Sequence, residues 1–228
     1  MDTRFWGHDG WRLLHSIAYL YKPETSQQIE RFLTLVKDIL PCRYCRQSFA
    51  EFLEELPITS YLTSSKKLRL WLYKIHNKVN NKLRNQGLLQ EANPTLEYVD
   101  DLYANVHLNP PVGWDFLYSI IYNYSSKPSA TIKPQIYEEW FSLLGQIAPC
   151  PRFRELYKKL PPIQQNLKTA KDLQRWFYEF QKLYYTSQHV KCSSFTSVCK
   201  RYESIKVPIC SNSTSHQSRS PPMATCRK

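Results

Sequence analysis

Apolar residues recur at three- and four-residue steps along most of the chain, the spacing of one face of an α-helix. Between Ser64 and Arg84, for example, an apolar face alternates with a face of lysines. The sequence has five glycines and fifteen prolines, and prolines stand between the periodic stretches, where they end helices. We therefore predict an all-α protein whose helices are separated by prolines.

Four periodic stretches come first and predict a four-helix bundle. They run over residues 10–21, 27–40, 42–56 and 64–84. A hydrophobic share of 42% in a chain of 228 residues is sufficient for a buried core. We assign residues 1–92 to this bundle.

The next segment, residues 93–186, repeats parts of the first. Three stretches match in the same order, at offsets of 103, 108 and 105 residues: 11–17 with 114–120, 40–42 with 148–150, and 68–73 with 173–178. The second copy lacks the second cysteine and the histidines of the first. Phe153 stands where the second cysteine would be, Tyr118 replaces His15, and Gln181-Lys182 replaces His76-Asn77. We predict a second, degenerate bundle that packs on the first as a pseudo-dimer.

Residues 187–228 are rich in Ser, Thr, Pro and Lys and predict a flexible basic tail. This tail carries Cys192, Cys199, Cys210 and Cys226.

The net charge of +12 is spread along the chain, and no zinc-finger, homeodomain or RNA-recognition signature accompanies it. We interpret the charge as a solvated basic surface and do not expect nucleic acid binding. The N-terminus lacks an apolar signal region, and no window approaches the roughly 18 apolar residues that a membrane span needs. We expect a protein that is neither secreted nor in the membrane.

The pair Cys42 and Cys45 follows Pro41 at the start of a predicted helix. Unpaired amides and the positive end of the helix dipole stabilise a thiolate there, and Arg43 and Arg46 act in the same direction. Two cysteines at this spacing can form an exchangeable disulfide, which an incoming thiolate attacks through a mixed disulfide. The pair therefore indicates dithiol redox chemistry.

Zinc binding is the alternative interpretation of this pair, but a Cys-x-x-Cys motif supplies only half of the ligands. The sequence has no second Cys-x-x-Cys motif, and no two histidines stand at the His-x3-5-His spacing of zinc ligands. A thioredoxin-like site would need a βαβ pattern, which these helical stretches do not provide. We expect no metal site, and keep a zinc-stabilised or basic helical binding module as the alternative to a redox enzyme.

Three motifs together resemble the Erv/ALR family of FAD-linked sulfhydryl oxidases. They are Gly7-x3-Trp11-x2-Leu14-His15, Pro41-Cys42-x2-Cys45-x3-Phe49 and Trp71-Leu72-x3-His76-Asn77-x-Val79-Asn80-x2-Leu83. The motifs span about residues 5–85, in the order and at the spacing of that family. Added helical segments resemble those of the oxidases that large DNA viruses encode.

The resemblance implies a thiol oxidase in which a four-helix bundle holds FAD. Cys42 would exchange electrons with a protein dithiol, Cys45 would lie beside the flavin, and oxygen would leave as hydrogen peroxide. We expect a cleft bordered by Cys45, Trp11 and His76. The residues implied for cofactor binding are Gly7, His8, Trp11, His15, Trp71, His76, Asn77, Val79, Asn80, Lys82 and Arg84.

Two positions depart from the family pattern. His8 stands where the family commonly has Arg, and Tyr73 stands where the family has a cysteine of an additional structural disulfide. That disulfide cannot form here. The tail cysteines resemble the family's shuttle pair only loosely, because six residues separate Cys192 from Cys199.

The same resemblance implies the partners and the location. Thioredoxin-like proteins or viral structural proteins are the candidate dithiol substrates, and a further homodimer is left open. We expect the protein in the cytoplasm or nucleus of an infected host cell, or in the virion.

Overall fold

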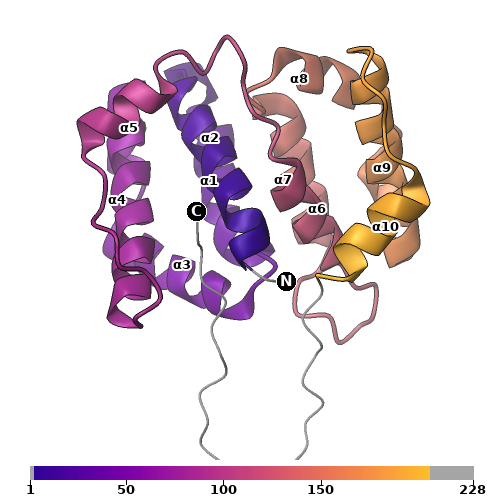
Figure 1. Cartoon of the computed structure of the whole chain (residues 1–228), viewed down its shortest axis with the longest axis horizontal. Helices are drawn as coiled ribbons and strands as arrows, with labels where there is room; N and C mark the ends of the chain where they lie inside the picture. The colour runs from indigo at the N-terminus through magenta and orange to yellow at the C-terminus, as the bar shows by residue number, and fades with distance from the viewer. Residues whose placement is uncertain (1–2, 206–228) are drawn as a thin grey trace, which may run out of the picture.

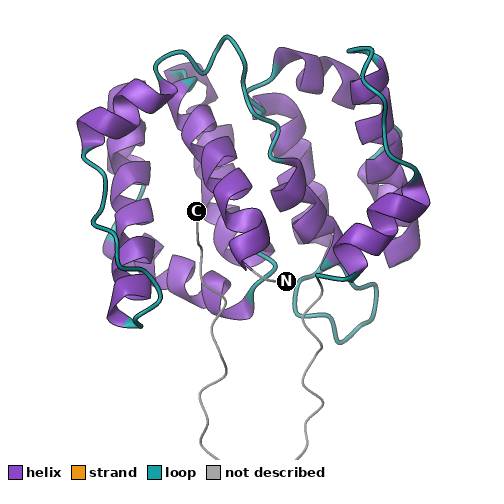
Figure 2. Ribbon diagram, in the orientation of Figure 1, coloured by secondary structure: helices purple, strands orange, loops and turns teal. Residues whose placement is uncertain are grey.

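The computed structural model describes residues 3–205, and this part of the chain holds helices and loops but no β-strand (Figure 2). The predicted all-α class is confirmed. The α-helices of the described residues are α1 (Thr3–Tyr19), α2 (Ser26–Ile39), α3 (Arg43–Glu55), α4 (Ser65–Asn85), α5 (Leu96–Tyr103), α6 (Trp114–Tyr122), α7 (Pro134–Ile147), α8 (Pro151–Tyr157), α9 (Ala170–Thr186) and α10 (Phe195–Glu203). Short 3-10 helices cover Pro23–Thr25, Thr59–Tyr61 and Ile163–Asn166. No helix in the described range has the length and apolar character needed to cross a membrane.

Local side-chain bonds explain where several helices begin. The Ser64 hydroxyl accepts the Lys67 amide at the start of α4, and Thr169 accepts the Asp172 amide at the start of α9. Proline occupies the first turn of α7 and of α8, where its missing N–H is not needed. The main departure from the predicted boundaries is α1, which begins at Thr3 rather than near Gly10.

The helices lie in two groups side by side, α1–α5 and α6–α10 (Figure 1). The groups meet where α1 packs on α6 and α2 packs on α7. Within the groups, α5 packs on α1 and α4, and α10 packs on α6 and α9. The division of the chain at residues 92 and 186 is not tested by these contacts and stays a prediction.

The two groups repeat several hydrogen bonds at the offsets seen in the sequence. The Trp71 indole N–H donates to the Leu56 carbonyl over 2.9 Å, and the Trp176 indole donates to the Pro161 carbonyl over 2.9 Å. A second matching pair runs from the Tyr21 hydroxyl to the Leu62 carbonyl and from the Tyr124 hydroxyl to the Leu167 carbonyl. In a third, Arg46 donates to the Leu40 carbonyl and Arg154 to the Ala148 carbonyl.

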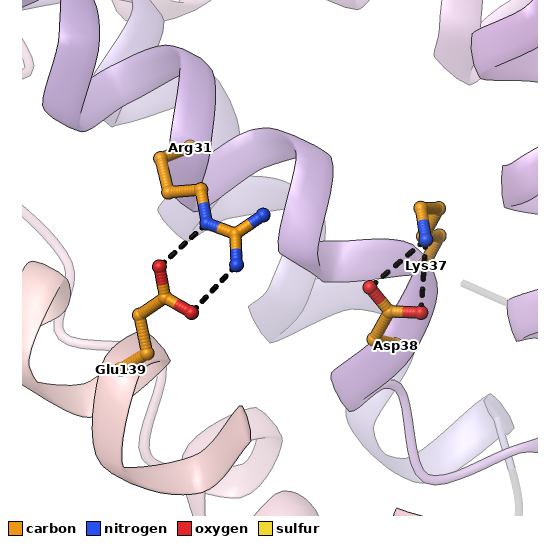
Figure 3. Close-up of polar contacts among 4 residues, drawn as sticks. All are labelled: Arg31, Lys37, Asp38 and Glu139. Carbon is orange, nitrogen blue, oxygen red and sulfur yellow. Dashed lines mark hydrogen bonds and ion pairs between the residues drawn. The ribbon is translucent and has the colours of Figure 1, made fainter. Parts of the chain in front are cut away.

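The contact between the groups is close because it is built around glycine. A Cβ atom on Gly10 of α1 would lie 3.1 Å from the Phe116 ring of α6, and Gly113 has a φ of +75°. The Asp9 carboxylate accepts the Asp115 amide at the start of α6, over 3.1 Å. At the edge of the contact, Arg31 of α2 binds Glu139 of α7 through two parallel hydrogen bonds (Figure 3).

The prediction of a flexible tail from residue 187 is wrong for Phe195–Glu203, which form α10. Val198, Cys199 and Tyr202 are buried on one face of this helix. The helix is only nine residues long, so its apolar periodicity is too brief to distinguish from a polar linker. Cys210 and Cys226 of the predicted tail lie outside the described residues.

Candidate functional site

The predicted redox pair lies at the start of α3. Cys42 is the N-cap residue, its Sγ accepts the Cys45 amide over 3.2 Å, and the two cysteines form a disulfide with Cα atoms 5.1 Å apart. Both side chains are half-buried against the core. The position at the positive end of the helix dipole is therefore confirmed, and it favours a thiolate once the disulfide is opened.

Two arginines flank the pair in different ways. Arg43 is exposed, whereas Arg46 is half-buried and donates to the Leu40 carbonyl over 2.6 Å. Burial, with a smaller contribution from the charge of Arg43, lowers the pKa of Arg46. Tyr44 between them is 56% exposed, so an aromatic ring and the Arg43 cation stand at the surface next to the disulfide.

A cavity of about 990 Å³ opens between α1, α4 and α5. Five of the residues implied for cofactor binding line it: His8, Trp11, His76, Val79 and Asn80. The size is within the usual range of small-molecule and cofactor sites.

An aromatic pair forms one wall of this cavity. The rings of Trp11 and His76 are stacked, with centroids 3.9 Å apart and planes 11° from parallel. His15 lies behind them, 3% exposed, and its Nε2 is 3.1 Å from Nδ1 of His76. This arrangement joins the first and third motifs of the sequence, which are 61 residues apart at these positions.

Burial keeps both imidazoles neutral. It lowers the pKa of His15 to about 4. The pKa of His76 is lowered to about 3, first by burial and then by the neighbouring His15. His15 also holds a buried Nδ1 without a hydrogen-bond partner.

The remaining implied residues lie elsewhere. Trp71 is fully buried and donates to Leu56, so it is a core residue and does not border the cavity. Gly7 is buried on α1, and Asn77 is half-buried without lining the cavity. Arg84 donates to the Glu91 carbonyl over 2.8 Å.

Lys82 faces α3 and not the cavity. It donates to Ser48, one turn after Cys45, and lines a shallower groove of about 410 Å³ between α3 and α4. Neither Cys42 nor Cys45 lines the larger cavity. The expected cleft bordered by Cys45, Trp11 and His76 is therefore correct for the two rings and wrong for Cys45, because Cys45 lies on α3 and no residue of α3 lines the cavity.

Several cavity residues were missing from the prediction. Arg4 and Arg12 line the cavity with His8 and Trp11, and these four share one helical face, a spacing that would have identified both arginines. Tyr103 and residues 87–92 also line it. No local pattern indicates these, because their position depends on the path of the chain after α4.

The corresponding place in the second group is filled by side chains. Trp114 of α6, which aligns with Trp11, has six aromatic rings with centroids within 6.4 Å: Tyr118, Phe153, Phe177, Phe180, Tyr184 and Tyr185. Cys150 is the N-cap of α8, as Cys42 is of α3, and its Sγ lies 3.3 Å from the Tyr184 hydroxyl. Apart from the disulfide, the cysteines of the described residues are the free thiols Cys150, Cys192 and Cys199.

Comparison with known proteins identifies the family of this site. The model of the Erv1/Alr family matches residues 8–97. An FAD-linked sulfhydryl oxidase of African swine fever virus, isolate Warthog/Namibia/Wart80/1980, is 32% identical over 83 residues, which are 34% of this chain and 67% of that protein. The chain belongs to the Erv1/Alr family.

Other relatives of the Erv1/Alr family match the same segment. The mitochondrial FAD-linked sulfhydryl oxidase of Saccharomyces cerevisiae is 33% identical over 87 residues, covering 36% of this chain and 45% of that protein. A protein of Acanthamoeba polyphaga mimivirus that is named as a probable FAD-linked sulfhydryl oxidase is 33% identical over 85 residues. The match covers 35% of this chain and 59% of that protein. The chain thus spans about half of the length of these two relatives.

The matched segment holds both predicted site elements, the cysteine pair and the α1 and α4 walls of the cavity. No solved structure matches the chain at a significant level. The described residues contain no group of three or more His, Cys, Asp or Glu side chains placed to hold a metal ion.

Proposed function

We propose that this chain is an FAD-linked sulfhydryl oxidase that forms disulfides in protein dithiols. The observation that carries the proposal is a disulfide at the N-cap of α3 in the same segment as a cavity walled by stacked Trp11 and His76. Family membership supports the same reaction, because the relatives that cover this segment are named as FAD-linked sulfhydryl oxidases.

The side chains around the cavity fit FAD. Trp11 and His76 offer flat faces for an isoalloxazine or adenine ring, and Asn80 offers an amide for ring or ribose oxygens. Arg4 and Arg12 bring cations to the same cavity, suited to a pyrophosphate. Bound FAD would supply a two-electron acceptor that oxygen reoxidises, with hydrogen peroxide as the product.

The cysteine pair carries out the exchange with the substrate. A substrate thiolate attacks Cys42 Sγ, a new S–S bond forms, and the Cys42–Cys45 bond breaks. Cys45 leaves as a thiolate in the first turn of α3, where the positive end of the helix dipole favours it, and the Cys45 amide donates to Cys42 Sγ. The second substrate thiol then displaces Cys42, so the substrate has lost two electrons and two protons and the pair has become a dithiol.

The histidines keep the cavity wall uncharged. With both pKa values lowered by burial, His15 and His76 stay neutral at physiological pH and can share one hydrogen bond. A neutral imidazole can stack on a flat ring without introducing a buried charge next to it.

An absorbance spectrum of the purified full chain tests the proposal. We expect a yellow protein with bound flavin near one per chain, and oxygen uptake when dithiothreitol is added. A colourless protein that cannot be reconstituted with FAD would contradict the proposal. Release of zinc to a chelator from such a protein would instead support the helical binding module.

A further inference from the structure

Tyr103, the last residue of α5, closes the back of the cavity wall. It is 9% exposed, lines the cavity, and stacks on His15 with ring centroids 5.1 Å apart and planes 24° from parallel. His15 in turn meets His76, and His76 is stacked on Trp11. The four rings therefore form one continuous row from α5 through α1 to α4 and back to α1.

Polar contacts hold α5 in the place that this row requires. The Asp100 carboxylate accepts the Tyr19 hydroxyl of α1 and binds Arg69 of α4 at 3.3 Å. Before the helix, the Tyr73 hydroxyl donates to the Pro94 carbonyl over 2.9 Å. These bonds connect α5 to both helices that carry the other rings, so the position of Tyr103 is determined by the fold.

We propose that Tyr103 is a positioning residue of the cofactor site, whose ring holds His15, and through it His76 and Trp11, in the arrangement that binds FAD. The inference rests on the proposed function. It goes beyond the family match, which ends at residue 97. The ring has this role and the hydroxyl does not, because the contact with His15 is a stack of rings.

The second group supplies a matched control. Tyr202 of α10 stacks on Tyr118 of α6, with centroids 4.4 Å apart and planes at 20°. Tyr118 aligns with His15, and Tyr202 is 4% exposed, so the two tyrosines have the same kind of packing. Only Tyr103 borders the cavity.

The experiment compares Tyr103→Leu, Tyr103→Phe and Tyr202→Leu in the full chain. Leucine keeps much of the buried volume and removes the flat ring, so folding is preserved better than with alanine. FAD affinity is measured by quenching of flavin fluorescence during reconstitution of the apoprotein, and melting temperatures are measured on the same apoproteins. These readouts do not depend on turnover.

We expect Tyr103→Leu to weaken FAD binding roughly 3- to 10-fold, the effect of losing an aromatic stack. Tyr103→Phe should restore the affinity, and Tyr202→Leu should bind FAD like the wild type despite an equal or lower melting temperature. Wild-type affinity in Tyr103→Leu would overturn the inference. Equal loss in Tyr103→Leu and Tyr202→Leu would also overturn it, because the effect would then follow stability alone.

Failure of the proposed function would look different. In that case the wild-type chain itself would not bind FAD, whereas failure of the Tyr103 inference leaves wild-type binding intact and only removes the difference between the variants. If Tyr103→Leu does not fold, Tyr103→Met replaces it. Wild-type FAD affinity in Tyr103→Met would overturn the inference in the same way.

Discussion

Nε2 of His15 and Nδ1 of His76 lie 3.1 Å apart, so one imidazole donates a hydrogen bond to the other. His15 Nδ1 is buried without a partner. A buried acceptor without a partner is better tolerated than a buried N–H without one, which favours donation from His15 to His76. Nε2 of His76 then carries the second proton of the pair.

The buried pair predicts a loss of stability as the pH falls. Because the folded pKa values are lowered to about 4 for His15 and about 3 for His76, the unfolded chain takes up protons below about pH 6.5 that the folded chain does not. Urea unfolding at intervals from pH 7 to pH 4 should show a decline of a few kcal/mol from this source. We expect His15 to contribute more of this decline than His76, because His15 is buried whereas His76 is partly exposed to the cavity.

A His15→Gln, His76→Gln double variant should flatten the decline in this window. His107, which is exposed, provides the control, and His107→Gln should keep the wild-type slope. An unchanged slope in the double variant would contradict the assignment to the buried pair.

Cys45 of the α3 disulfide and Cys150, the N-cap of α8, are expected to give opposite results on replacement. Cys45→Ser should retain FAD but lose oxygen uptake with dithiothreitol, because the disulfide with Cys42 can no longer form. Cys150→Ser should keep wild-type turnover, since Cys150 is a free thiol beside Tyr184. Normal turnover in Cys45→Ser, or a large loss in Cys150→Ser, would show that the pair has been assigned to the wrong role.

Replacement of Gly145 of α7 by a larger residue should produce a strong steric clash. A Cβ atom at this position would overlap the Tyr157 ring of α8, so Gly145→Ala should lower the free energy of unfolding by about 1–3 kcal/mol. Gly87→Ala is the comparison: its φ is +70° but no atom lies within 4 Å of the added Cβ, and about 1 kcal/mol of backbone strain is expected. Chemical denaturation measures both, and an effect of Gly145→Ala no larger than that of Gly87→Ala would contradict the predicted overlap.

The ion pair between Arg31 and Glu139 predicts a small, salt-sensitive contribution. Their side chains are 52% and 39% exposed, so a double-mutant cycle with Arg31→Met and Glu139→Gln should give a coupling of about 0.5–1 kcal/mol at low salt. Arg31 lowers the pKa of Glu139, so this contribution is present above the pKa of the unfolded carboxyl and is lost as the pH falls through the folded value. Coupling that is unchanged in 1 M salt would be inconsistent with a screened surface pair.

The sequence by itself determined the features that depend on neighbours along one helix. The period of the apolar residues placed α1 to α4, and the motif Pro41-Cys42-x2-Cys45 placed the redox pair at a helix start. The family resemblance supplied His8 and Trp11 of α1 and His76, Val79 and Asn80 of α4 as cofactor-binding residues, and all five line the cavity. Spacing along a helix is a local property of 3.6 residues per turn.

Only the tertiary structure decided which of these faces meet and what else joins them. Trp71 belongs to the same family motif as His76, yet it is fully buried in the core and donates to the Leu56 carbonyl. Lys82 turns to Ser48 of α3. Tyr103 and α10 had no detectable signal, because a short helix is placed by the path of the preceding loop and by the surface that it covers. Contacts between distant segments arise from packing of the whole chain, which no local pattern records.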